Sequence, residues 1–257
     1  MRRLILEEPY SQAALWSRRC AILALPVAGF GLAFGRFGFT DLPNAVAVFV
    51  SALLLAVLAL VLTGFAAAAI WNKGLRGLGK ALTGAFLALA LLAWPVFMVL
   101  RSLDQPQLTD ISTDTDVPPS FSGDDKAVAQ RGFMPSAMPA NQRMMQAKAY
   151  PDIQPLVLDM DVQDAYATAQ AVVKALGWQI MDTQAPSIGA ADGRLEARAR
   201  SLLMGIPYAL SIRIKALPEG TRLDIRSASH LGAHDFGANA ELIRKFTTAF
   251  KNEVDGR

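Results

Sequence analysis

The chain has very few of the residues that enzymes and metalloproteins commonly use. Its 257 residues include one cysteine, Cys20, and two histidines, and only 18% are charged. One cysteine excludes an intrachain disulfide, and since Cys20 lies outside a lipoprotein processing context we interpret it as a small buried apolar residue. The sequence also lacks a G-x-S-x-G elbow, a phosphate-cradling loop and an H-E-x-x-H helix. We therefore expect neither catalytic residues nor a cofactor.

Apolar residues, by contrast, are in excess, at 53% of the chain. Most of the excess lies before Arg101, in runs that predict membrane spans at about residues 20–39, 45–70 and 81–100. Because about 20 helical residues cross the hydrocarbon core of a bilayer, each run is long enough to span one. The second and third runs carry no charge, which favours an anchor over a transporter or channel. Residues 1–103 are thus predicted to form a three-helix transmembrane anchor.

Lysine and arginine residues beside the spans predict the orientation. Arg36 alone lies between the first two spans, whereas the other flanks carry Arg2, Arg3, Arg18, Arg19, Lys73, Arg76 and Lys80. The positive-inside rule then gives a cytoplasmic N-terminus and an extracytoplasmic domain after Arg101. A cleaved signal peptide is the alternative for the first run, although no small-x-small cleavage site follows it.

The basic character of the chain belongs to the anchor. Residues 1–100 carry 8 Lys or Arg against 3 Asp or Glu, whereas residues 101–257 carry 17 against 19. The second part therefore has a formal charge of 17 − 19 = −2. This balance argues against a polyanion-binding domain, so we expect no nucleic-acid partner.

The segment 104–150 loses periodicity and gains proline, serine and aspartate. One part of it predicts a structured turn in which Asp and Thr side chains bond nearby backbone amides, formed by Asp110, Thr113, Asp114, Pro118, Pro119 and Phe121. Calcium binding is the alternative for its carboxylates, but the D-x-D-x-D-G spacing and the bidentate Glu are missing. Residues 122–148 are predicted to form a mobile or loosely helical arm.

The remaining sequence predicts an antiparallel α+β domain of the β-α-β-β-β-β-α order. Alternating residues indicate strands at 155–159, 178–183, 194–202, 208–217 and 221–229. Residues 161–176 and 236–254 show helical periodicity, and Asp161 and Gly177 supply start and stop signals. Two amphipathic helices can cover one sheet face, which gives a TBP-like or helix-grip-like architecture for the domain 104–257.

Two groups of residues stand out in this domain. The uncovered sheet face is expected to carry basic side chains, namely Arg198, Arg213, Lys215, Arg222 and Arg226. This face is either a surface for anionic partners or a solvated face with cross-strand charge pairs. The elbow between the last strand and the closing helix is a candidate binding or structural corner, formed by Arg226, Ser227, Ser229, Asp235, Gly237, Asn239 and Arg244.

A metal site is not expected. His230, His234 and Asp235 give an H-x3-H-D pattern beyond the last strand, but zinc usually needs further ligands that the local sequence does not supply.

Several motifs together resemble a known family. They are Asp110-Ile-Ser-Thr-Asp114, Pro118-Pro119, Phe121, Tyr150-Pro-Asp-Ile153, Gly177-Trp178 and the string Arg226-Ser-x-Ser229-x-x-Gly232-x-x-Asp235-x-Gly237-x-Asn239. With the three spans, they make the chain similar to the bacterial envelope proteins grouped as domain of unknown function 1499. The resemblance implies no activity, but it implies that residues 104–150 belong to the domain.

The chain departs from that family pattern at His230, where Arg is usual, and at Leu242, where a basic residue is usual. Tyr208-Ala209 stands where two acidic residues are common. If that acidic pair acts in catalysis or metal binding elsewhere in the family, this chain lacks it.

Three functions remain open at this point. The first is a non-catalytic protein of the bacterial inner membrane whose periplasmic domain binds another envelope protein or lipid. The second is a helix-grip pocket that holds a lipid or another apolar ligand. The third, which the motifs favour least, is a hydrolase or metal enzyme.

Overall fold

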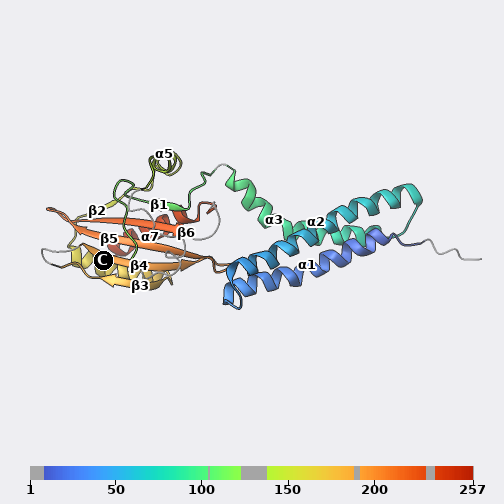
Figure 1. Ribbon diagram of the computed structural model, residues 1–257, viewed down its shortest axis with the longest axis horizontal. Coiled ribbons are helices and arrows are strands. Elements are labelled where there is room, and N and C mark those ends of the chain that lie inside the picture. The colour runs from blue at the N-terminus through green and yellow to red at the C-terminus, as the bar shows by residue number, and fades with distance from the viewer. Residues whose placement is uncertain (1–8, 104, 123–137, 188–191, 230–234, 257) are drawn as a thin grey trace, which may run out of the picture. The chain divides into compact units, whose positions relative to one another are not determined.

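The computed structural model describes residues 9–103, 105–122, 138–187, 192–229 and 235–256, and Figure 1 shows its helices and strands. The chain divides into two compact units. One consists of Met1–Leu100 with Leu202–Gly205, and the other of Arg101–Ser201 with Ile206–Arg257.

Three helices make up the part of the chain predicted to be a membrane anchor, and we keep the name anchor for them: α1 (Gln12–Phe37), α2 (Leu42–Lys73) and α3 (Leu78–Ser102). All three are long and apolar enough to cross a membrane, which confirms the prediction of three long apolar helices before the second unit. Each helix extends beyond its predicted apolar run at one end or at both, and capping residues mark both ends of α1 and the C-terminal end of α2. The Ser11 hydroxyl accepts a hydrogen bond from the Ala14 amide, and Gly38 and Gly74 end α1 and α2 with left-handed φ angles of 71° and 64°.

Small side chains let the anchor helices approach each other. The largest buried cluster among them consists of alanines from all three helices, namely Ala21, Ala24, Ala56, Ala59 and Ala88. At Gly31 a Cβ atom would lie 2.7 Å from the backbone nitrogen of Phe49, so α1 and α2 pack there only because glycine has none. The Ser17 hydroxyl bonds the Ala59 carbonyl at 2.9 Å and the Thr63 hydroxyl at 2.7 Å. Packing and polar contacts of this kind drive helix association in lipid.

The other unit is built on a six-stranded antiparallel sheet. Its strands are β1 (Asp110–Ser112), β2 (Leu156–Leu158), β3 (Gln179–Gln184), β4 (Gly193–Arg200), β5 (Pro207–Ala216) and β6 (Thr221–Ser229). The order is β1-β6-β5-β4-β3, and β2 pairs with the other half of β6. Together with its helices the unit is α+β, as the alternation predicts.

The helices α6 (Val162–Ala175) and α7 (Ala238–Asp255) pack on each other and on the sheet, where they enclose the core (Figure 1). Asp161 caps α6 by accepting a hydrogen bond from the Gln163 amide at 2.7 Å. The core contains side chains from alternate strand positions and from one stripe of each helix, among them Leu195, Leu210, Ile212, Ile225, Ala169, Val173, Ile243, Phe246 and Phe250. Alternation therefore leaves the intervening strand residues on the opposite face.

The segment before β2 contributes two further elements, β1 and α5 (Ala140–Ala149). Gln146 of α5 is buried, accepting a hydrogen bond from the Ser112 amide at 3.1 Å and donating one to the Ser112 carbonyl at 2.6 Å. Its amide group thus pairs with β1 as a neighbouring strand would. Residues 140–148 of the predicted arm belong to this helix, and residues 123–137 lie outside the described residues.

Candidate functional site

The sheet face opposite α6 and α7 carries the charged residues singled out by the sequence. Register places Arg213 of β5 opposite Asp224 of β6, and Ser211 opposite Arg226. Arg222 lies on the same face, two residues before Asp224. The strands thus bring basic and acidic side chains together on one surface.

This face is not open, which corrects the expectation drawn from the sequence. Residues 113–122, here called the covering segment, cross it. The Ser211 hydroxyl donates to the Ser120 carbonyl at 2.7 Å, and the Ser122 hydroxyl donates to the Glu196 carboxylate at 2.7 Å. Only 1% of Arg226 remains exposed. The expectation of a solvated face failed because strand alternation says nothing about what a distant segment covers. The cross-strand charge pairs expected there are present, since Arg213 of β5 bonds Asp224 of β6.

Four side chains form an ion-pair network on this face, and one of them, Asp114, belongs to the covering segment. Arg213 bonds the Asp224 carboxylate at 2.7 Å, and Arg222 bonds it at 2.9 Å. The same two arginines bond Asp114 at 3.0 and 2.8 Å. Asp224 is fully buried, and its charge is neutralised by two guanidinium groups.

Asp114 also holds the turn of the covering segment. Its carboxylate accepts hydrogen bonds from the amides of Val117 and Asp116, at 2.9 and 3.1 Å. Burial by itself raises the pKa of Asp114, but the Val117 and Asp116 amides with Arg222 and Arg213 outweigh it, so the pKa lies below its ordinary value.

Arg226 forms the second ion pair of this face. It bonds both carboxylate oxygens of Asp110, at 2.9 and 2.6 Å, and donates to the Pro119 carbonyl at 3.1 Å. The Phe121 ring lies 5.3 Å from its guanidinium carbon. The Thr113 hydroxyl accepts from the Ile225 amide at 2.8 Å, and Pro118 is buried. All residues of the predicted turn therefore lie on or beside this face.

The structure also describes the exposure of the other two basic residues expected on the face. Lys215 is exposed at the end of β5, and Arg198 of β4 is half-buried.

The elbow residues separate into distinct groups. Ser227, Ser229 and Asn239 form one hydrogen-bonded group with the Thr109 carbonyl, on the α7 side of the sheet. The Ser227 hydroxyl bonds the Asn239 side chain at 2.9 Å, and the Asn239 amide group donates to the Thr109 carbonyl at 3.1 Å. The Ser229 amide donates to the same carbonyl at 2.8 Å. Arg226 points to the opposite face, because it is the neighbour of Ser227 along the strand.

Asp235 holds the start of α7. One carboxylate oxygen accepts from the Gly237 amide at 2.9 Å, and the other accepts from the Asn239 amide at 3.0 Å. Gly237 has a φ of 76°, a left-handed conformation that favours glycine, and a Cβ on it would also displace the end of the Gln105 side chain, 2.4 Å away. Burial, together with the Asp235 and Glu241 carboxylates, raises the pKa of nearby Tyr208 to about 12.

Arg244 does not join these groups. It bonds both oxygens of Asp152, at 2.6 and 2.8 Å, and stacks over the Tyr150 ring at 5.4 Å. The hydrogen bond from Arg244 lowers the pKa of Asp152.

Metal ligands do not gather in the part of the chain that the structure describes, where no group of three His, Cys, Asp or Glu side chains is found. His230 and His234 lie outside the described residues.

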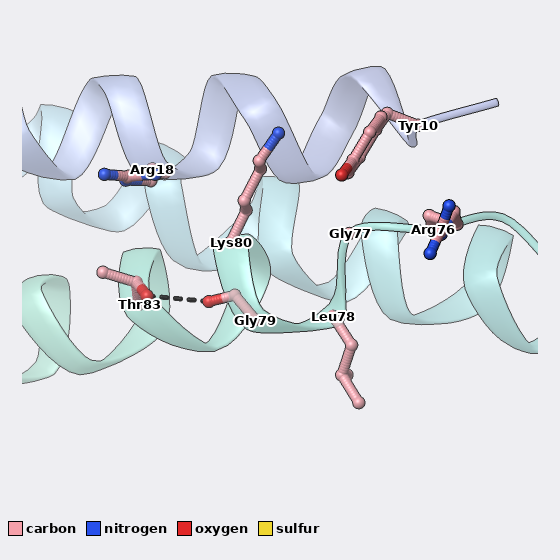
Figure 2. Close-up of a pocket in the computed structure, with 8 residues that line it drawn as sticks. All are labelled: Tyr10, Arg18, Arg76, Gly77, Leu78, Gly79, Lys80 and Thr83. Atoms are coloured by element: carbon pink, nitrogen blue, oxygen red, sulfur yellow. Dashed lines mark hydrogen bonds between the residues drawn. The ribbon is translucent and has the colours of Figure 1, made fainter. Parts of the chain in front are cut away.

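A basic pocket at one end of the anchor is a site that the sequence did not single out. It has a volume of about 420 Å³ and lies where the residues before α1 meet the loop between α2 and α3. Two backbone hydrogen bonds join those segments, from the Ser11 amide to the Arg76 carbonyl at 2.9 Å and from the Arg76 amide to the Pro9 carbonyl at 3.2 Å. Figure 2 shows Lys80 reaching from α3 toward α1 between Arg18 and Tyr10.

The Lys80 ammonium lies 3.8 Å from the centre of the Tyr10 ring. In the sequence, Arg18, Arg76 and Lys80 are visible only as basic flanks of three spans. The sequence therefore shows that basic residues flank successive apolar runs, but only the packing of the helices brings these residues around one cavity.

A comparison with protein-family models matches residues 110–250, more than half of the chain, to the family described as "Protein of unknown function (DUF1499)". A search of the curated proteins gave no match.

Proposed function

Because the chain belongs to the DUF1499 family, whose description names no activity, we propose its role from its architecture. It is a non-catalytic protein anchored in the bacterial inner membrane by three helices. Its domain after Arg101 lies in the periplasm and binds another component of the envelope.

The non-catalytic assignment rests on one observation, which is that the charged side chains of the sheet face are bonded to each other. On the covered sheet face, Asp224, Arg213, Arg222 and Asp114 bond each other, and Arg226 bonds Asp110. A catalytic acid, base or nucleophile needs an open approach for a substrate, whereas Asp224 and Arg226 are buried on the sheet face that the covering segment crosses. They stabilise the fold, which leaves the outer surface of the domain for recognition.

The distribution of basic residues supports the orientation. Lys73, Arg76 and Lys80 lie in or beside the connection between α2 and α3, and Arg18 and Arg19 precede the first apolar run. The connection between α1 and α2 holds only one acidic residue, Asp41, with Arg36 in the last turn of α1. Positive-inside counting then puts the N-terminus in the cytoplasm.

Enzyme fusions in living cells test this orientation. Alkaline phosphatase, which is active only outside the cytoplasm, should be active when fused after Arg257 and inactive when fused near Lys80. The reverse pattern would contradict the periplasmic assignment and every inference that depends on it.

A shallow cavity of about 410 Å³ on α7 is the surface we assign to the partner. Its lining combines charged and apolar side chains, among them Glu241, Lys245, Ala249 and Leu176. Interfaces that form and dissociate have this mixed character.

Photo-crosslinking tests the surface. A photoreactive residue in place of Thr248, inside the cavity, should capture a discrete envelope component in cells. The same residue in place of Lys215, exposed at the end of β5, is the control and should not capture it. Equal capture at both positions, or none at either, would overturn the assignment of the surface.

The apolar-pocket hypothesis has less support. The space between the sheet and the helices α6 and α7 is filled by side chains such as Leu210, Ile243 and Phe246, each at most 1% exposed. A buried ligand there would have to displace well-packed core residues.

A further inference from the structure

The turn between β4 and β5 leads to a second proposal. It contains three consecutive apolar residues, Leu202, Leu203 and Met204, here called the apolar tip. Tight turns are usually built from glycine, proline, asparagine, aspartate and serine, because these residues suit the backbone geometry of a turn. We propose that the apolar tip inserts into the lipid bilayer beside the anchor and gives the domain a membrane contact of its own. The proposal rests on the membrane anchor of the proposed function, but not on its orientation or on the partner surface of α7.

The two leucines of the apolar tip are exposed. Leu202 is 87% exposed and Leu203 is 53% exposed, so the described part of the chain does not cover them. A single apolar side chain on a protein surface is common, whereas neighbouring exposed ones keep a contiguous apolar surface in water. Such a surface is typical of a site that a membrane or another protein covers.

The turn holds the apolar tip in a defined shape. The Ser201 amide donates to the Ile206 carbonyl at 2.9 Å, and the Ile206 amide donates to the Ser201 hydroxyl oxygen at 3.0 Å. Gly205 has a left-handed φ of 66°, which lets the chain reverse direction there. The leucines are therefore presented by a formed turn, and little ordering is needed when lipid covers them.

The turn at the other end of β5 has the opposite character. Residues 217–220 read Leu-Pro-Glu-Gly, and the Leu217 amide donates to the Gly220 carbonyl at 3.0 Å. Glu219 is exposed in this turn, and a carboxylate opposes entry into the hydrocarbon region. Of the two turns that flank β5, the apolar tip is thus the one suited to lipid.

The position of the apolar tip identifies its environment as the membrane. The compact unit that contains α1, α2 and α3 also includes Leu202–Gly205. Within that unit, a Cβ atom on Gly35 would lie 2.8 Å from the Met204 carbonyl oxygen, so the backbone of the apolar tip approaches the last turn of α1. Phe37 and Phe39, at and just after the end of α1, are exposed, and aromatic side chains at the end of a span favour the membrane interface. The apolar tip therefore lies at the depth where the hydrocarbon region begins.

The order of the spans agrees with this position. When α1, α2 and α3 cross the bilayer in turn, α1 and α3 end on the same side of it. The chain leaves α3 at Ser102, and the described residues after it include no further candidate span. The turn between β4 and β5 is therefore on the side where α1 ends, for either orientation of the anchor.

Fluorescence quenching by lipid tests the proposal with the full chain. Cys20→Ala removes the one native thiol, and Leu202→Cys then carries a fluorescent label. The protein is reconstituted into vesicles of phosphatidylethanolamine and phosphatidylglycerol, with a nitroxide quencher on the acyl chains of part of the lipid. The label at position 202 should lose several times more fluorescence than a label on a part of the domain that faces water.

Two labelled positions serve as controls in the same background. Val157→Cys replaces an apolar residue of β2 that is 68% exposed, and its label should stay unquenched. Leu54→Cys, at an exposed position of α2, is the reference for lipid contact and should be quenched. Quenching at Leu54 with equally little at Leu202 and Val157 would overturn the apolar tip and leave the anchor standing. Absence of quenching at Leu54 would overturn the anchor and the apolar tip together.

A photoreactive lipid tests the wild-type chain, so the result does not depend on a variant that folds. Phosphatidylcholine with a diazirine on its acyl chain is added to the vesicles and activated by light. Trypsin cuts after Arg200 and Arg213, and mass spectrometry should find lipid on the peptide 201–213 but not on the peptide 149–174, which contains Val157. Lipid on both peptides or on neither would contradict the proposal. Protection of the apolar tip from a water-soluble carbene reagent without attached lipid would assign the surface to a protein and would also overturn it.

Discussion

Arg226 is the largest side chain that the described part of the domain buries completely. A guanidinium group carries its charge at every physiological pH, so its burial costs free energy unless carboxylates and carbonyls replace water. Asp110 and the Pro119 carbonyl do so here, with the Phe121 ring beside the group. The residue therefore joins β6, β1 and the covering segment.

Arg226→Ala should destabilise the domain strongly, because it leaves Asp110 without its partner. Removing one member of a buried pair costs about 3–5 kcal/mol, and we expect a value near the lower end since the Asp110 side chain is 17% exposed. Chemical unfolding measures the change. The control Arg143→Ala breaks an exposed pair with Asp116 and should cost about 1 kcal/mol or less. If Arg226→Ala unfolds like the wild type yet fails to complement a deletion strain, the residue is a binding residue.

Asp114 should make stability depend on acid pH. Its folded pKa is lowered, so its contribution is complete above the unfolded value of about 3.9 and is lost as the pH falls through the folded pKa. Asp114→Asn should therefore be less stable than the wild type at pH 6, and the difference should shrink toward pH 3. Melting temperatures across this range measure it. Asp159→Asn, at an exposed position, is the control, and an unchanged difference at all pH values would contradict the assignment.

At the scale of elements, the start of α7 depends on a residue outside the helix. Phe236 and Gly237 both have left-handed φ angles, 54° and 76°, so the chain turns sharply before Ala238. Gly237 is the N-cap and has no side chain to bond the free amides. Asp235 takes over that role from two residues upstream.

Asp235→Ala should destabilise the domain by about 0.5–2 kcal/mol, because the amides of Gly237 and Asn239 lose their acceptor. Thermal or urea unfolding measures the loss. Asp255→Ala, at the opposite end of α7, is the control and should be neutral or slightly stabilising, since a negative charge is unfavourable at a helix C-terminus. Unchanged stability in Asp235→Ala would assign the elbow to binding instead.

At the scale of the whole molecule, the domain has a core of its own. The cluster of buried apolar residues extends from Leu108 to Phe250 and includes none from α1, α2 or α3. A closed core of this kind in about 150 residues is enough for independent folding.

Residues 104–257 expressed alone should therefore unfold cooperatively without the anchor. A chelator should leave the melting temperature unchanged, because the described residues gather no metal-ligating cluster. Calorimetry with and without chelator measures both properties. A decrease of several degrees on chelation would point to a metal site at His230 and His234 or at Asp110 to Asp116.

Local signals in the sequence determined much of the fold. Uninterrupted apolar runs predicted the three long apolar helices, and strict alternation in Leu210–Lys215 and Leu223–Arg226 predicted the orientation of β5 and β6. Asp161 and Gly177 marked the ends of α6 within a few residues. These features follow from the sequence because helix periodicity, strand alternation and capping involve neighbours along the chain.

Only the tertiary structure decided what covers the charged sheet face and what surrounds the basic pocket. Asp114 and Arg222 are 108 positions apart, and Ser112 depends on Gln146 for its backbone hydrogen bonds. Arg18 and Lys80 approach one cavity only because α1 and α3 pack together. Contacts of this kind form between residues distant along the chain, so neither composition nor periodicity predicts them, and chain packing alone brings the residues together.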